Sequence, residues 1–197
     1  MTLADPVTIG TLITVALGSS VVGTGLTQGF TTYRESDTKK RELEYLALRL
    51  AIAFERFAED ATAYSSALGS YEMNDERGVI VKIPKMPAFP DDKERWRDLD
   101  VRVTSAVLGF DHIRRSRQGS IDDTWENASP EDGIDVARIY GIQLGHDALE
   151  IARKIRLRYK LPPLVTPAVW PEYLQTEWDK IDPQWRDDQT SNKLISI

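Results

Sequence analysis

Two histidines are the residues of this chain best suited to chemistry, and each stands beside an aspartate. His112 follows Asp111 in "FDHIRR", and His146 precedes Asp147 in "GHDALE", with Glu150 one helical turn later. Imidazole nitrogens and carboxylate oxygens that project from facing helices are suitable ligands for a divalent metal ion. These residues therefore raise the hypothesis of a metal-dependent helical hydrolase.

The surrounding pattern argues against such a site. His112 directly precedes the apolar position Ile113, and His146 falls between the apolar positions Leu144 and Ala148, so neither histidine clearly faces a helical core. The chain has no Glu-x-x-His step, no cysteine and no phosphate-binding loop. We therefore expect no enzymatic activity, no catalytic residue, no metal site and no cofactor.

The composition is that of a folded protein that does not bind nucleic acid. The 197 residues suit one domain with appendages, and a hydrophobic fraction of 41% beside a charged fraction of 28% is enough for a core. The net charge of −6 argues against nucleic acid as a partner.

The first segment with a decisive pattern is an uncharged run near the N-terminus. Val7 to Phe30 is 24 residues without a charge, which as a helix measures about 36 Å and exceeds the roughly 30 Å of a bilayer core. Asp5 and Pro6 suit the start of a helix. Only eleven of the 24 are Val, Ile, Leu, Ala or Phe, because Gly, Thr, Ser and Gln make up the rest. The run predicts a transmembrane anchor over residues 1–33, and the alternative is a helix of a soluble subunit that is buried in a partner assembly.

The charges that flank this run predict its orientation. No Lys or Arg precedes it, so a basic signal-peptide region is missing, whereas Arg34, Lys39, Lys40 and Arg41 follow it. By the positive-inside rule, the N-terminus lies outside and the bulk of the chain is cytoplasmic. The four cations are expected to contact lipid headgroups.

Small residues within the run share one helical face. Thr14, Gly18, Gly25 and Gly29 follow one another at steps of four, seven and four, and the last two form a GxxxG step. In lipid, such a face lets two helix backbones approach closely. We expect a homo-oligomer that is paired through these four residues.

Beyond Tyr33 the pattern becomes amphipathic and predicts an all-α domain over residues 34–160. Apolar residues recur at steps of three and four in three segments, 37–70, 91–119 and 129–161. Residues 79–89, "VIVKIPKMPAF", read as a short strand or an extended connector. Three long helices with one apolar stripe each bury those stripes best in an antiparallel, coiled-coil-like bundle.

An antiparallel order would bring two basic clusters together. The second helix would return toward the membrane, so Arg114, Arg115 and Arg117 would lie beside residues 39–41 at the headgroups. The basic run "ARKIRLRYK" (152–160) would then lie at the opposite, distal end.

The C-terminal tail, 161–197, combines five prolines with three tryptophans. Trp170, Trp178 and Trp185 are expected to pack back on the bundle or to anchor a protein partner, because disordered segments are poor in aromatic residues. The whole pattern predicts a non-enzymatic, single-pass membrane protein whose bundle acts as a scaffold, an adaptor or a membrane-associated effector through self-association.

Overall fold

The protein is all-α in its computed structural model. The structure describes residues 9–71, 81–90, 95–164 and 169–183, and for residues 9–36 it describes the backbone alone. The helices are α1 (Ile9–Gly69), a 3-10 turn η1 (Arg95–Asp98), α2 (Val101–Asn127), α3 (Pro130–Arg158) and α4 (Trp170–Lys180). No strand occurs among these residues.

The chain divides into two compact units, residues 1–42 and 43–197. Unit 1 holds the first part of α1. Unit 2 begins at Leu43 within α1 and holds the remainder of that helix together with α2, α3 and α4.

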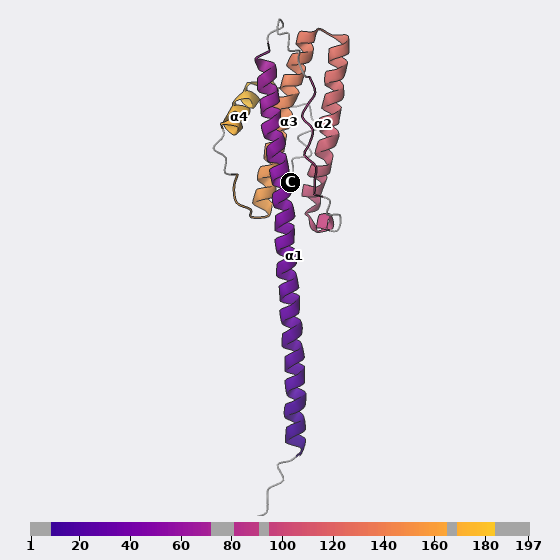
Figure 1. The fold of residues 1–197 in the computed structure, drawn as a ribbon, viewed down its shortest axis with the longest axis vertical. Coiled ribbons are helices and arrows are strands. Elements are labelled where there is room, and N and C mark those ends of the chain that lie inside the picture. Colours follow the sequence, from indigo (N-terminus) through magenta and orange to yellow (C-terminus); the bar gives the residue numbers. More distant parts are fainter. Residues whose placement is uncertain (1–8, 72–80, 91–94, 165–168, 184–197) are drawn as a thin grey trace, which may run out of the picture. The chain divides into compact units, whose positions relative to one another are not determined.

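Helices α1 and α2 run parallel to each other, which corrects the antiparallel order expected from the sequence. The rings of Phe57 and Phe110 meet edge to face with centroids 5.1 Å apart. Further along both helices, burial and then the nearby charge of Asp122 raise the pKa of Tyr64. The numbers rise together on the two helices, as the colours do in Figure 1.

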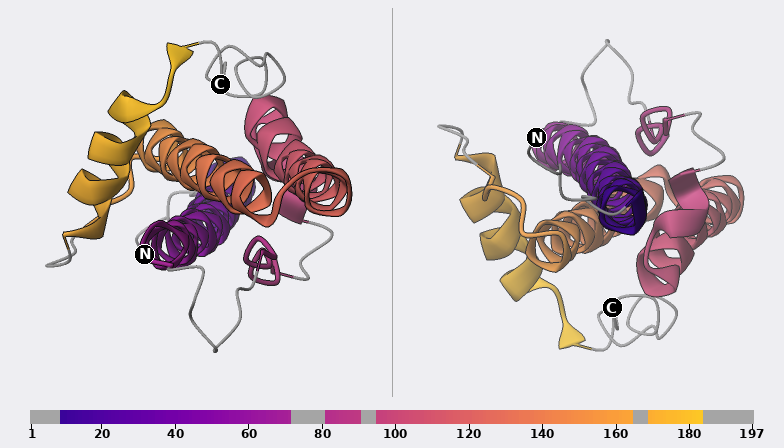
Figure 2. Two further views of the ribbon diagram at one scale, coloured as in Figure 1. Left: turned by 90° about the horizontal axis from the view of Figure 1, so that it is seen from above. Right: turned by 90° about the horizontal axis from the view of Figure 1, so that it is seen from below.

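Helix α3 runs opposite to both of them. Its start lies beside the end of α1, since a Cβ added at Gly141 would meet Tyr64 Cδ1 at 2.9 Å. Near the end of α3, Arg156 Nε donates to Glu55 Oε1 at 2.5 Å, midway along the part of α1 that belongs to unit 2. Seen along the bundle, α3 lies between α2 and α4 (Figure 2). Unit 2 therefore has one end near Leu43, Asp100 and Arg158, and a far end near Gly69 and Asn127.

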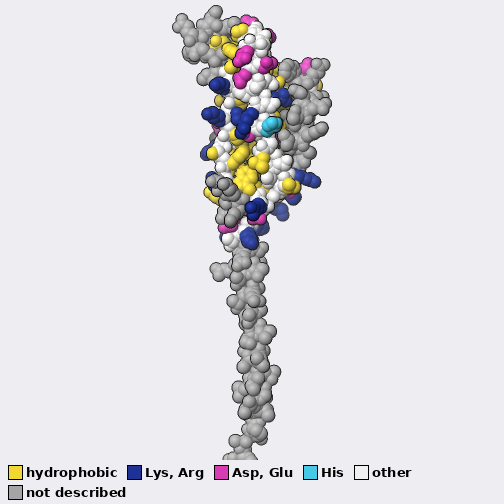
Figure 3. Space-filling model, turned by 90° about the vertical axis from the view of Figure 1, so that its right-hand side faces the viewer, with side chains coloured by type: hydrophobic (Ala, Val, Ile, Leu, Met, Phe, Trp, Pro, Cys, Tyr) yellow, Lys and Arg dark blue, Asp and Glu magenta, His cyan; other side chains and the backbone are white. Residues whose placement is uncertain are grey.

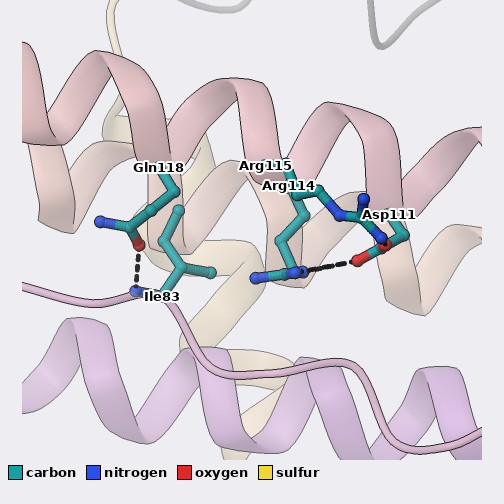
Figure 4. A network of polar contacts seen from close by, with 5 residues as sticks. All are labelled: Ile83, Asp111, Arg114, Arg115 and Gln118. Carbon is teal, nitrogen blue, oxygen red and sulfur yellow. Dashed lines mark hydrogen bonds and ion pairs between the residues drawn. The ribbon is translucent and has the colours of Figure 1, made fainter.

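An extended segment, residues 81–90, causes the parallel order by carrying the chain back along the bundle. Ile83 is buried in the core, and its N–H donates to Gln118 Oε1 at 2.8 Å (Figure 4). The Nε2 of the same amide donates to the Val81 carbonyl at 3.4 Å. Phe89 then packs on Phe54 with ring centroids 5.9 Å apart. The side chain of Gln118 thus pairs with the extended backbone as a neighbouring strand would.

The bounds of α2 also differ from the expectation. The helix begins at Val101 rather than near Asp91, because the Asp100 carboxylate accepts the Arg102 N–H at 2.8 Å and caps it. It continues past Gly119 to Asn127, and the continuation places Ile121 in the core. Glycine weakens a helix interior by only about 1 kcal/mol, which one buried isoleucine offsets.

The start of α3 is as expected from the sequence. Ser129 and Asp132 form a reciprocal capping box, with Pro130 at the first helical position. Each large apolar side chain that is fully buried contributes roughly 1.5–3 kcal/mol. The largest of them in the described core are Leu46, Leu50, Phe54, Phe57, Val103, Phe110, Ile121, Ile142, Leu144, Ile151, Ile155 and Leu174.

Candidate functional surface

In the first His-Asp pair, Asp111 and His112, the aspartate forms ion pairs on the surface of α2. Asp111 accepts from Arg114 Nε at 3.0 Å and also pairs with Arg115, as Figure 4 shows. Burial alone would raise the pKa of the Asp111 carboxyl, but the two guanidinium groups outweigh it and the pKa is lowered. His112 is exposed on the outer side of α2. This carboxylate is thus committed to arginine.

The second histidine lies between α3 and α4. The His146 ring stacks on the Trp178 ring with centroids 4.3 Å apart and planes 8° apart. Asp147 beside it is buried. Within the described part of the chain, no group of three or more His, Asp or Glu side chains is placed to hold a metal ion. The structure does not bring the two His-Asp pairs together into one site.

The three arginines of α2 that were expected at lipid headgroups have different surroundings. Arg117 is only 8% exposed, and its guanidinium lies 4.5 Å from the centre of the Tyr140 ring. Arg114 is largely covered, and of the three only Arg115 is well exposed. All three lie on the stretch of α2 that packs beside residues 57–64 of α1, away from the Leu43 end. The expected meeting with residues 39–41 rested on an antiparallel α2, and the structure has α2 parallel to α1 within unit 2.

The predicted residues of unit 1 are described only in part. Lys39, Lys40 and Arg41 are exposed, and Arg41 pairs with Asp37 at 2.9 Å. The remaining ones lie outside the residues whose side chains the structure describes, and these are Thr14, Gly18, Gly25, Gly29 and Arg34.

The tail tryptophans contribute to the packing of α4 on α3. Trp170 and Trp178 are partly buried against the core, and Leu174 between them is fully buried. A Cβ added at Gly145 of α3 would lie 3.2 Å from Leu174 Cδ1, so this glycine lets α4 approach closely. Trp185 lies outside the described residues.

Sequence reasoning missed a surface where the first turn of α2 meets the last turn of α3. Five of its residues, Val101, Arg102, Lys154, Leu157 and Arg158, line an open depression of about 660 Å³ and are called the base surface below. Val101 is 78% exposed and Leu157 is 79% exposed. The surface lies at the Leu43 end of unit 2. Its signal in the sequence was "KIRLR", where an apolar residue off the helical stripe stands among cations.

A network around Asp100 holds this surface together. Asp100 caps α2, its N–H donates to the Tyr159 hydroxyl at 2.8 Å, and its carboxylate accepts from Arg158 Nη2 at 2.6 Å. The cap bond from the Arg102 N–H is the largest influence on the carboxyl, and with Arg158 it lowers the pKa of Asp100. The two helix ends are thereby joined by one ionised carboxylate.

The far end of unit 2 carries the opposite charge. Its exposed carboxylates belong to the end of α2 and the start of α3, and they are Asp122, Asp123, Glu126, Glu131, Asp132 and Asp135. On the face in Figure 3, the larger acidic patches lie in the upper part of the described surface, and Lys and Arg lie in its middle and lower parts. Unit 2 is thus electrically polar along its axis.

No protein-family model, curated protein or solved structure matches the chain.

Within the described residues, no helix is long and apolar enough to cross a membrane. The uncharged run 7–30 lies outside the residues whose side chains are described. What the described residues offer is a bundle with a closed core, a base surface that combines cations with exposed apolar side chains, and an acidic far end. The base surface is therefore the candidate functional surface of unit 2.

Proposed function

We propose that this chain is a single-pass membrane protein whose helical bundle lies on the cytoplasmic side. There the bundle acts without catalysis as a scaffold, an adaptor or a membrane-associated effector. The observation that carries the proposal is the run of 24 uncharged residues, 7–30, almost all of which falls within helix α1 (Ile9–Gly69). A helix satisfies its own backbone hydrogen bonds, which a segment in lipid requires. Thr and Ser hydroxyls in the run are able to bond back to the helix backbone.

The charges support the orientation. Arg34, Lys39, Lys40 and Arg41 follow the run directly, and cations on this side favour a cytoplasmic location. The base surface lies at the Leu43 end of unit 2, and the exposed carboxylates lie at its far end. The cytoplasmic leaflet is anionic, so this polarity suits a bundle that keeps its basic end toward the membrane.

Self-association is proposed through the small-residue face of the anchor. Thr14, Gly18, Gly25 and Gly29 lack bulky side chains, and in lipid such residues let helices pack at short distance. Oligomers formed in this way would present several bundles to a common partner. The tail beyond α4, which includes Trp185, is proposed as a second point of protein contact.

A specific observation favours a second candidate. Thirteen of the 24 residues in the run are Gly, Thr, Ser or Gln, so the run is less apolar than most membrane helices. A helix of this kind also packs tightly against protein. The second candidate is therefore a subunit without a lipid span, whose N-terminal helix is buried in a partner assembly.

Membrane extraction separates the two candidates. Membranes that contain the full chain are washed with alkaline carbonate and floated on a density gradient. A lipid-spanning anchor stays with the floating membranes, and a Val15→Asp, Val22→Asp variant is expected to lose this retention because each buried carboxylate costs about 2.5–3.5 kcal/mol at the centre of a span. A matched Leu108→Asp variant, changed at an exposed apolar position outside the run and outside the base surface, should stay with the membranes. Release of the unaltered chain by carbonate would reject the anchor.

Topology is tested on the same membranes. The chain has no cysteine, so single cysteines placed at Thr2 and Ser70 report their sides without background. In intact cells, a membrane-impermeant maleimide is expected to label Thr2→Cys and to spare Ser70→Cys until the cells are opened. Labelling of Ser70→Cys in intact cells would contradict the orientation.

Self-association is tested by measuring oligomer size in detergent. Replacement of Gly25 and Gly29 by Leu should reduce the protein to monomers, because the larger side chains keep the helix backbones apart. Leu12→Ile, Leu26→Ile is the matched variant, since it changes the same helix outside the small-residue face and should leave the oligomer intact. An unchanged oligomer in the glycine variant would rule out pairing through this face.

A further inference from the structure

We propose that the base surface docks on the anionic headgroups of the membrane in which the chain is anchored. This inference rests on the proposed anchor and adds to it a named surface, a partner chemistry and a resting position for the bundle. The partner is an anionic phospholipid surface, and the contact residues are Val101, Arg102, Lys154, Leu157 and Arg158.

The apolar residues of this surface, Val101 and Leu157, are not part of the described core. Among the large hydrophobic side chains described, Leu157 at 79% and Val101 at 78% are the two most exposed. They line one depression together, whereas Leu108, at 61%, lies elsewhere on α2. Exposed apolar side chains grouped with cations are typical of surfaces that enter the boundary between headgroups and acyl chains.

The charged residues around Val101 and Leu157 favour binding to an anionic surface. Three cations and one carboxylate line the depression, and that carboxylate belongs to Asp100. Asp100 accepts from Arg158 and from the capped Arg102 N–H, so its negative charge is directed into the bundle's own contacts. The surface therefore carries a net positive charge, and the long stems of Arg and Lys let their charged ends reach phosphate while the stems cover apolar area.

The chain keeps this surface within reach of the headgroups. Nine residues, 34–42, separate the proposed anchor, residues 1–33, from the first residue of unit 2, and as a helix they measure about 14 Å. The headgroup layer takes up about 5–8 Å of that length, because a bilayer is about 40–45 Å thick around a core of about 30 Å. Arg and Lys side chains and an ordinary helix tilt cover the remainder. The acidic far end is repelled by the same surface, which gives the docked bundle its orientation.

Two single-cysteine variants of the full chain test the contact. Leu157→Cys lies on the base surface, and Leu108→Cys is the matched control because it replaces the same exposed residue type on another face. Each is labelled with a fluorophore that emits to the blue in an apolar environment, and is reconstituted into phosphatidylcholine vesicles with an increasing share of phosphatidylglycerol. We expect the label at Leu157→Cys to shift to the blue as phosphatidylglycerol increases, and the label at Leu108→Cys to stay water-like.

Charge variants test the selectivity for anionic lipid. Arg102→Gln with Lys154→Gln, in the Leu157→Cys background, should weaken the docked state about 25-fold, at about fivefold per cation. Arg56→Gln with Arg115→Gln removes the same charge from exposed positions outside the base surface and should leave the shift unchanged. Circular dichroism of all variants confirms that the helices remain.

The outcomes separate failure of this inference from failure of the anchor. If the protein does not float with vesicles, the anchor is rejected and the inference falls with it. If it floats and the label at Leu157→Cys stays water-like at every lipid composition, the anchor stands and the inference is wrong. A blue shift that ignores phosphatidylglycerol and follows the protein-to-lipid ratio would show contact between copies of the chain, and would also overturn the inference.

Discussion

The ion pair between Glu55 and Arg156 offers the most direct test of how unit 2 is held together. Arg156 of α3 binds the Glu55 carboxylate of α1 in a bidentate manner, with Nε–Oε1 at 2.5 Å and Nη2–Oε2 at 2.9 Å. The side chains are 8% and 12% exposed, for Glu55 and Arg156 respectively. Arg156 also donates to the Pro162 carbonyl, and the bond to Glu55 raises the pKa of its guanidinium. The pair thus joins two helices and the connection to α4.

The change is Glu55→Ala, which leaves the guanidinium of Arg156 largely buried, with the Pro162 carbonyl as its remaining partner among the residues that the structure describes. Removal of one member of a buried ion pair costs about 3–5 kcal/mol of unfolding free energy, whereas replacing both members with apolar residues is often neutral. With a denaturant slope near 2 kcal/mol per molar urea, the midpoint should fall by about 2 M. The double variant Glu55→Leu, Arg156→Met should restore most of that loss.

The assay is urea unfolding followed by circular dichroism, applied to the single variants and to the double variant. We expect a coupling free energy of at least about 1 kcal/mol between the two sites, the range seen for contacting residues. A midpoint for Glu55→Ala within about 0.3 M of the unaltered protein, together with additive effects in the cycle, would refute the view that this pair fixes α3 on α1.

Three further predictions concern single positions. Gly141→Ala should lower the free energy of unfolding by about 1–3 kcal/mol, because its Cβ would lie 2.9 Å from Tyr64 Cδ1 and closer still to Ser65 Oγ. Gly119→Ala is the matched variant: its Cβ would meet nothing within 4 Å, so it should stabilise α2 by about 0.5–1 kcal/mol. Thermal unfolding of the two variants checks both signs. Leu174→Ala empties a fully buried position and should cost about 2–5 kcal/mol of α4 docking, seen as faster amide hydrogen exchange in α4 with α2 unaffected. The pKa of Asp100 is lowered, so its ionised form stabilises the fold above the ordinary pKa near 3.8, and this contribution is lost as the pH falls below that value. Asp100→Asn keeps a capping oxygen and should flatten the acid limb of stability against pH, and an unchanged acid limb would count against the assignment.

The local patterns of the sequence predicted the helices better than their order. The capping box at Ser129 and the apolar stripes required only neighbouring residues, and both are present in the structure. The start of α2 was misplaced because Asp91 and Asp100 are equally good caps by type, and the choice between them follows from bonds that Asp100 makes with Tyr159 and Arg158. Such long-range partners cannot be read from a helical period.

The candidate surface was missed for a related reason. An apolar stripe predicts which face of a helix is buried. It does not predict whether two packed helices run parallel or antiparallel. Leu157 and Val101 are 56 positions apart, and only the parallel order of α1 and α2 places both at the Leu43 end. The polar residues Gln118 and Asp100, which hold the extended segment and the two helix ends, lie off the apolar stripes. The sequence therefore showed which residues are cationic, but it did not show which of them lie together at one end of the bundle.

The extended segment contains the signal that decides between the two orders. Ten residues in extended form, 81–90, span about 33 Å, whereas a helical connection between antiparallel neighbours needs only a few residues. The part of α1 between Phe54 and Gly69 measures about 22 Å, so the segment is long enough to return past it, and Phe89 near its end packs on Phe54. A connector of this length, with three prolines among its ten residues, therefore favours a parallel second helix. That order places Lys154 and Arg158 of α3 with Arg102 of α2 at the Leu43 end of unit 2, and leaves Arg114, Arg115 and Arg117 away from that end.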